Sequence, residues 1–569
     1  MRAARFLLAV LSLAPLALLT STSLCASTDD AAGKSDPAAK ARAAAAGDPL
    51  LEALLTELER SKSQLKMDQV QPPYYIEYRV HEVNLFAVEA AFGALREEQN
   101  TRARVLRVVV RVGNYKQDSF FGQGMGETTI LPLDNDSIAI RHQIWLATDE
   151  AYKAASEALT EKQAFMKQFA ADSNPVDDFA RATPINSIGS LAQLRIDSAA
   201  WRKTLEESTN LYRQYPALQS LSASARFAVV NEYFVNSEGT VTRSGHASYT
   251  VTLDGATQAA DGMRLNRSPY WTVARPEELP GRDALLGETR KMLDALMALR
   301  EAPIAEEEYR GPVLFSADAA DDMFAGLIGA NILGRKPQPG RPNRTTGAFA
   351  TSFKSRVLPS FLTVVDDPTV KQFHGESLVG AYDVDSEGVL GQAIVAIDNG
   401  NLTNYLVGRQ PIRDYPASNG HGRAAPGVFP QPSLGNLFVR TSEPKPVAAL
   451  RQRMLEMVRA QGKPYAYRVE TLGPGNSPRL LYRVHEKDGH EELVRGAVFN
   501  ELDVRTLRNN LAAAGDDPLV SNRAGGVLTT IVSPSILLDE LEVKRADTSK
   551  DKLPEYPPPP LAQTNAKKP

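Results

Sequence analysis

GPVLFSADAADDMFAGLIGANIL, residues 311–333, lies where the texture of this 569-residue chain changes. Its later part, near residues 319–333, is apolar and Ala-rich and predicts a helix. From residue 309 onward, Gly, Pro and Asn separate many short apolar runs, which is typical of strands joined by turns. We therefore expect residues 308–546 to form a β-rich domain with few helices, a second one lying near residues 448–461.

Turn signals within this region predict how its strands follow one another. Asp398-Asn399-Gly400 separates the runs 392–397 and 402–407, and an Asn-Gly pair is a strong hairpin signal. Three later runs resemble a meander of strands, at 465–472, 480–486 and 492–499.

The preceding half mixes helices and strands. Asp48 is placed to cap a helix that has Pro49 in its first turn. A turn at Ser237-Glu238-Gly239 separates two runs with strand character. Further helices are predicted at 137–170, 197–211 and 283–300, and strands at 76–80, 108–112, 226–235 and 240–253. The predicted fold class is therefore α+β in two domains, residues 48–303 and 308–546.

Length and composition agree with a multidomain globular protein. Single cores stop growing near about 250–300 residues, so this chain needs more than one. A hydrophobic fraction of 43% and a charged fraction of 23% are ordinary for a folded chain. The formal charge of −4 gives no basic footprint for nucleic acid. One cysteine excludes an internal disulfide and any multi-cysteine metal site.

The N-terminal residues 1–26 have the pattern of a secretory signal. Arg2 and Arg5 precede an apolar run that is shorter than the ~20 residues a membrane span needs, and no later segment is long enough. We therefore expect a periplasmic or secreted protein. Lipid attachment normally needs a small residue before the cysteine, and Leu24 before Cys25 argues against it.

Both ends of the exported chain are expected to lie outside the domains. Residues 27–47 are Ala-, Asp-, Lys- and Ser-rich and are interpreted as a low-complexity spacer. Residues 547–569 carry four consecutive prolines at 557–560 and are interpreted as a disordered Pro-rich tail.

One segment fits a zinc-peptidase pattern. His485-Glu486-Lys487-Asp488-Gly489-His490 matches HExxxH, in which two histidines and a glutamate act together on a helix. Here Lys-Asp-Gly predicts a hairpin turn, which we expect to be exposed and to splay the histidines.

Other candidate ligands are more isolated. Asp383-Val384-Asp385-Ser386-Glu387-Gly388 copies the first half of a calcium loop, but position twelve is Ile394 instead of Glu, and a turn between strands is favoured. His374 is a lone histidine near strand signals, and His421 lies in a Ser-Asn-Gly-rich loop that we expect to be mobile.

The second domain resembles the TldD/PmbA family of microcin-processing peptidases, also called modulators of DNA gyrase. The resemblance depends on short stretches in the family's order and is weaker but consistent over 48–300. The stretches are GPVLF at 311–315 with the helix of 316–330, VVDDPT at 364–369, YDVDSEG at 382–388, AIDNGNL at 396–402, PSLGNL at 432–437, and TIVSPS at 530–535 with ELE at 540–542.

The resemblance also locates the family's metal site. Active members carry HExxxH on the helix that follows the GPV strand, with a Cys ligand near the C-terminus. The alignment places Ala325 at the first His, Gly326 at the catalytic Glu and Ala330 at the second His, and the only Cys is Cys25. Methyl groups and hydrogens cannot bind zinc, and no general base remains there. We therefore expect no catalytic residue and no cofactor at this helix.

The resemblance implies a role without catalysis, because PmbA-type subunits lack HExxxH and pair with a TldD-type catalytic partner that acts on unfolded peptides. A subunit that pairs with such a homologue or with itself, or that holds peptides, is the favoured hypothesis. Two alternatives stay open. One is an active metallopeptidase that binds zinc through His485, Glu486, His490, His374 or His421. The other is a periplasmic scaffold with no peptide role.

Overall fold

The computed structural model describes residues 42–169, 175–338, 340–341 and 343–554. The predicted signal at 1–26, with Cys25, lies outside the described residues, as do most of the predicted spacer and the proline run. Residues 42–47 of the spacer are described, and Ala45 is buried with the first helix. No helix in the described ranges is long and apolar enough to cross a membrane.

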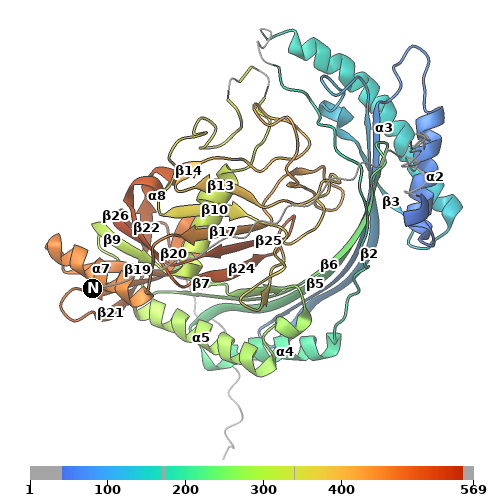
Figure 1. The fold of residues 1–569 in the computed structure, drawn as a ribbon. Coiled ribbons are helices and arrows are strands. Elements are labelled where there is room, and N and C mark those ends of the chain that lie inside the picture. The colour runs from blue at the N-terminus through green and yellow to red at the C-terminus, as the bar shows by residue number, and fades with distance from the viewer. Residues whose placement is uncertain (1–41, 170–174, 339, 342, 555–569) are drawn as a thin grey trace, which may run out of the picture. The chain divides into compact units, whose positions relative to one another are not determined.

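A curved, mostly antiparallel sheet forms the framework of the first half, with only β4 running parallel to its neighbour β6 among the described strands (Figure 1). Its order in the described residues is β3-β2-β1-β5-β6-β4, with β7 and β8 also paired to β6. Two long hairpins dominate it, and the second turns at Ser237–Gly239 as predicted. The strands are β1 Tyr75–Ala91, β2 Ala94–Arg111, β3 Glu127–Leu131, β4 Asn186–Ile188, β5 Leu218–Asn236, β6 Val241–Gln258, β7 Arg264–Arg267 and β8 Tyr270–Val273.

Helices cover one face of this sheet (Figure 1). They are α2 Pro49–Gln64, α3 Ser137–Met166, α4 Ser198–Asn210 and α5 Arg282–Glu301, which confirms the four predicted helices. The Asp48 carboxylate accepts hydrogen bonds from the N–H groups of Leu50 and Leu51, so the predicted cap is also confirmed. Side chains of a strand alternate between faces, and the residues of β1 that face α2 and α3 are apolar.

The opposite face of the same strand is polar and buried. Tyr75, Glu77, Arg79 and His81 alternate with the apolar set along β1, and all four are at most 5% exposed. Loops of the second half lie along this inner face (Figure 1). A Cβ added at Gly388, for example, would lie 2.8 Å from the Phe234 ring of β5. The polar strand face is therefore an internal surface between the two halves.

Two larger sheets and two small hairpins form the second half. The order is β14-β13-β10-β17-β25-β24 in one sheet and β18-β23-β26-β9-β19-β20-β21 in the other, with β22 paired to β26. The strands are β9 Glu308–Phe315, β10 Leu362–Asp366, β11 Gln372–Phe373, β12 Glu376–Ser377, β13 Ile394–Asp398, β14 Asn401–Leu402, β15 Gly422–Arg423, β16 Gln431–Pro432, β17 Asn436–Thr441, β18 Pro444–Lys445, β19 Tyr465–Gly473, β20 Ser477–His485, β21 Glu491–Val494, β22 Ala497–Asn500, β23 Leu511–Gly515, β24 Leu519–Arg523, β25 Thr529–Ser533 and β26 Ile536–Arg545.

The helices of this half are α6 Ala317–Met323, α7 Val447–Ala460 and α8 Val504–Asn510. The α+β class is confirmed, and the division into domains at 303–308 stays a prediction. The meander prediction was wrong in its third run, because residues 492–499 divide between β21 and β22 and β22 pairs with β26. The predicted strand 402–407 is also shorter, since β14 has only two residues.

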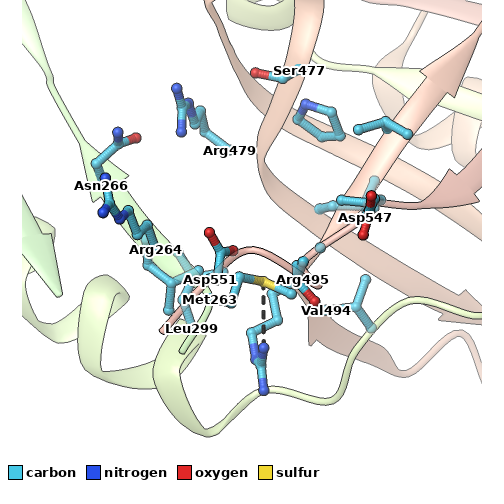
Figure 2. A pocket seen from close by; sticks show the side chains of 18 residues that line it. Met263, Arg264, Asn266, Leu299, Ser477, Arg479, Val494, Arg495, Asp547 and Asp551 are labelled. Atoms are coloured by element: carbon cyan, nitrogen blue, oxygen red, sulfur yellow. Dashed lines mark hydrogen bonds between the residues drawn. The ribbon is translucent and has the colours of Figure 1, made fainter. Parts of the chain in front are cut away.

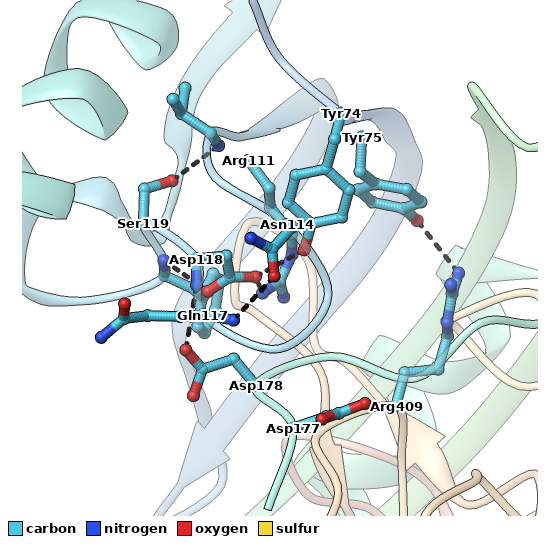
Figure 3. A network of polar contacts seen from close by, with 12 residues as sticks. Tyr74, Tyr75, Arg111, Asn114, Gln117, Asp118, Ser119, Asp177, Asp178 and Arg409 are labelled. Atoms are coloured by element: carbon cyan, nitrogen blue, oxygen red, sulfur yellow. Dashed lines mark hydrogen bonds and ion pairs between the residues drawn. The ribbon is translucent and has the colours of Figure 1, made fainter. Parts of the chain in front are cut away.

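A buried polar network joins the two halves. The Arg409 guanidinium, fully buried, donates to the Ala180 carbonyl at 2.7 Å and pairs with Glu238 at 2.8 Å. It also donates to the Tyr75 hydroxyl at 3.3 Å (Figure 3). Beside it, Arg111 pairs with Asp118 at 2.7 Å. Because Arg409 belongs to the second half and its three partners to the first, these contacts fix the second half against the sheet.

Candidate functional site

The helix that the resemblance associates with catalysis begins directly after a central strand. β9 ends at Phe315, and Ser316 caps α6 by accepting a hydrogen bond from the N–H of Ala319. The Ser316 hydroxyl donates to the Glu470 carbonyl of β19 at 2.6 Å, which ties the helix start to the sheet. Met323, Phe324 and Ile328 are fully buried and fix one side of the helix in the core.

After α6 the helix widens into a π segment, Phe324–Ile328, and ends in a 3₁₀ turn, Gly329–Asn331. The Gly329 N–H donates to the carbonyls of both Phe324 and Ala325. A π-helix bonds residues five apart, so positions i and i+5 lie close to one side of the helix, which an α-helix does not achieve. The bond that spans five residues here joins Gly329 to Phe324, one position before the pair Ala325 and Ala330, and Ala330 itself lies in the 3₁₀ turn.

The three aligned positions occupy the accessible side of this segment. Ala325 is half-buried and packs on the core, whereas Gly326 and Ala330 are exposed. A Cβ added at Gly326 would meet no atom within 4 Å, so the backbone leaves room for a side chain there. The backbone therefore leaves room on this side, but Ala325, Gly326 and Ala330 offer no nitrogen, oxygen or sulfur side-chain ligand.

Carboxylates lie one turn before these positions, and sequence reasoning missed them. Asp321 is 1% exposed and pairs with Arg523 of β24. The same guanidinium pairs with Asp322 at 2.7 Å. Burial raises the pKa of Asp321 to about 7, because Arg523 offsets only part of the desolvation. The sequence does show Asp321 and Asp322 one helical turn before Ala325, but it does not show that Arg523 would lie beside them.

The HExxxH match at 485–490 lies on the turn between β20 and β21, as predicted. His485 reaches Glu492 at 3.6 Å, while the carboxylate of Glu486 pairs with Arg459 of α7 at 2.6 Å. The expectation that the histidines splay apart was wrong, because the rings of His485 and His490 stack with centroids 6.0 Å apart. Glu486 is engaged elsewhere, so the turn does not gather the three side chains.

The two remaining histidines lie in different settings. His374 has a positive φ of 48° and stacks on the neighbouring Phe373 ring in the β11–β12 hairpin. The mobile-loop prediction for His421 was wrong, because its ring is fully buried and Nε2 lies 3.1 Å from Asp366 Oδ1. Within the described ranges, no three His, Cys, Asp or Glu side chains gather in a way that could hold a metal ion.

The calcium-like stretch forms a turn, closed by a bridge between Val384 and Leu390. Asp385 accepts hydrogen bonds at 2.9 Å from the N–H groups of Glu387, Val389 and Gly422. Burial, and then the neighbouring Glu387, raise the pKa of the Asp385 carboxyl well above its usual range. Its oxygens thus accept the backbone hydrogen bonds that hold the turn, and this structural role explains why the sequence resembles a calcium loop.

Comparisons with known proteins give a consistent picture. A profile described as the PmbA/TldA metallopeptidase C-terminal domain matches residues 308–545. A metalloprotease of Methanocaldococcus jannaschii is 29% identical over 124 residues, which are 22% of this chain and only 26% of that protein.

Solved structures share the fold at low identity. A protein of Thermotoga maritima, described as a modulator of DNA gyrase, has a TM-score of 0.58 at 14% identity, over 86% of this chain and 99% of its own. TldE from Thermococcus kodakarensis has a TM-score of 0.56 at 12% identity, over 87% and 100%. At these identities the likeness concerns the fold alone.

Proposed function

The chain belongs to the TldD/PmbA metallopeptidase family, and we propose that it is an exported, non-catalytic member that pairs with a catalytic homologue or holds peptides. One observation carries the proposal. The positions that we align with the family's motif, Ala325, Gly326 and Ala330, supply no metal ligand and no general base.

A sheet edge beside this helix supports the peptide-holding role. β24 ends the six-stranded sheet in the described residues, and its Arg523 pairs with Asp321 and Asp322 of α6. A strand at a sheet edge presents unpaired backbone N–H and C=O groups, and an extended peptide can add to it. A peptide bound there lies next to the family's motif position.

The alternative with substitute ligands has less support. It requires His485, His490, His374 or His421 to converge on residue 325, and their contacts are to Glu492, to Phe373 and to Asp366 instead. Zinc chemistry at such a site has no observation in its favour.

The test combines metal content, activity and pairing. We expect the purified full chain to hold well under one zinc per molecule, to leave denatured casein intact, and to co-purify with an HExxxH-bearing homologue from its own cells. A homologue variant with its two motif histidines replaced by Ala controls for pairing independent of catalysis. One tightly bound zinc per chain, with casein cleavage that a chelator stops, would contradict the proposal.

Export is tested separately, because it depends only on the first residues. We expect the full-length chain in the periplasmic fraction, and the variant Arg2→Glu, Arg5→Glu in the cytoplasm, because a positive n-region is part of the signal. Equal cytoplasmic retention of both chains would refute export without touching the catalytic proposal.

A further inference from the structure

A pocket of about 220 Å³ opens between the first and second halves of the chain, away from the π segment. β7 forms one wall, with Arg264 and Asn266, and the start of β20 forms another, with Ser477 and Arg479 (Figure 2). The chain segment that follows β26 closes a third side, where the Lys552 carbonyl accepts a hydrogen bond from Gln258 at 3.2 Å. Three separate parts of the sequence thus build one pocket.

Two arginine side chains of this pocket form no ion pair within the described residues, although the carboxylates of Asp547 and Asp551 also line the pocket. Neither the Arg264 nor the Arg479 guanidinium makes a hydrogen bond there, whereas the third arginine of the pocket, Arg495, pairs with Asp261 at 2.8 Å. Burial alone lowers the pKa of Arg479, with no anion to raise it again. A partly desolvated cation without a partner is unfavourable, and a bound anion relieves that cost.

Arg479 is held in position by the protein. A Cβ added at Gly473 would lie 2.2 Å from Arg479 Nε, so the arginine side chain lies close against the end of β19. It also repels Arg267, whose pKa its charge helps to lower. The side chain is therefore in contact with the end of β19, and its charge lies beside the pocket.

We propose that this pocket binds a carboxylate of a peptide, held by Arg264 and Arg479. The inference rests on the peptide-holding part of the proposed function. A guanidinium matches a carboxylate with two parallel N–H···O bonds. Leu265, Leu481 and Val494 also line the pocket and provide apolar contact for the rest of the residue that carries the carboxylate.

The two sources of such a carboxylate are an acidic side chain and a peptide C-terminus. Three fluorescent peptides separate them: one with an internal Glu and an amidated end, one with Gln in its place and an amidated end, and one with Gln and a free C-terminus. We expect one carboxylate peptide to bind the full chain at least tenfold more tightly than the neutral Gln amide, measured by fluorescence anisotropy. Which one does so identifies the source.

Variants then locate the binding. Arg479→Gln is expected to lower the affinity for the carboxylate peptide about tenfold, which is the range of one charge-assisted hydrogen bond. The affinity for the neutral peptide should stay unchanged. Arg264→Gln has a smaller effect, because Arg264 is exposed. Arg226→Gln, which removes an exposed arginine of β5 that does not line the pocket, is the matched control and is expected to change nothing. Gly473→Ala, which displaces Arg479 without altering its charge, should weaken the same peptide.

The outcomes are decisive in either direction. Equal affinity for all three peptides, or a carboxylate preference that survives in the double variant Arg264→Gln, Arg479→Gln, overturns the inference. Unfolding midpoints of each variant show whether a loss reflects the pocket or misfolding, and Arg479→Lys, which keeps the charge, should retain part of the preference. Zinc-dependent cleavage of casein would contradict the proposed function. It would not affect the result for the pocket, because that result is measured as peptide affinity.

Discussion

The network around Arg409 and the accessible side of the helix formed by α6 and the π segment differ in their polar side chains. In the first, a buried guanidinium, Glu238 and the Ala180 carbonyl satisfy one another inside the protein. On the second, Ala325, Gly326 and Ala330 present no polar side chain on a face that is partly open. Polar side chains are thus paired where the halves meet and are absent at 325, 326 and 330.

This difference teaches that geometry and chemistry of a site can be separated. The π segment is packed into the core through Phe324 and Ile328 and is held by backbone hydrogen bonds. Metal ligation depends on side chains that fold stability does not require. The following predictions test this contrast.

The largest effect is expected at the network. Arg409→Met leaves Glu238 without its buried partner and removes the donors to Ala180, so we expect the free energy of unfolding to fall by about 3–5 kcal/mol. Urea unfolding measures it. Arg226→Met, an exposed arginine, is the matched control and should stay within about 0.5 kcal/mol. A similar small change for both would show that the network does not hold the halves together.

A pH-dependent effect is expected at the base of the helix. The pKa of Asp321 is about 7 in the folded chain, against roughly 3.9 for a carboxyl in an unfolded one. The folded chain therefore keeps a proton that the unfolded chain has lost, and its stability falls as pH rises through this interval, by up to about 1.4 kcal/mol per unit.

Asp321→Asn should remove that slope between about pH 4 and pH 7, as unfolding curves at several pH values would show. Asp254→Asn, on the exposed side of β6, is the control and should leave the slope intact. An unchanged slope in the Asp321 variant would mean that the pairing with Arg523 keeps the carboxylate ionised.

The helix itself can be tested by adding the missing groups. The variant Ala325→His, Gly326→Glu, Ala330→His should bind zinc at least roughly tenfold more tightly than the unmodified chain, because it supplies two imidazoles and a carboxylate on the accessible side of the helix. The segment 485–490 already carries His, Glu and His, so these changes cannot be repeated there as a control. The control is therefore the variant with Ala330→His alone. Competition with a zinc-sensitive dye gives the affinities. No gain would mean that the helix lacks the motif's geometry.

The smallest effect is expected at the exposed turn. The double variant His485→Ala, His490→Ala should leave the metal content unchanged. Its free energy of unfolding should change by less than about 0.5 kcal/mol, because both side chains lie at the end of a hairpin. Metal analysis and urea unfolding measure both. A loss of bound zinc in this variant would revive the substitute-ligand alternative.

The sequence predicted the local elements well where the signals were local. Asp48 capped its helix, and the turn at Ser237–Gly239 joined two long strands. It failed at His421, because Ser, Asn and Gly around it resemble a mobile loop, and only the packing of distant Asp366 makes the ring buried. It failed also at the strand run 492–499, whose second part pairs with β26, a partner about 45 residues away in the chain.

By itself, the sequence determined the α+β class and the helix and turn positions, because each of these depends on residue type and near neighbours. The assignment of the motif to 325, 326 and 330 stays a prediction. Only the tertiary structure decided which side of the helix is open, that Asp321 meets Arg523, and that Arg264 and Arg479 meet across a pocket. Those outcomes depend on segments up to some 200 residues apart in the chain, and local sequence patterns carry no information on such pairings.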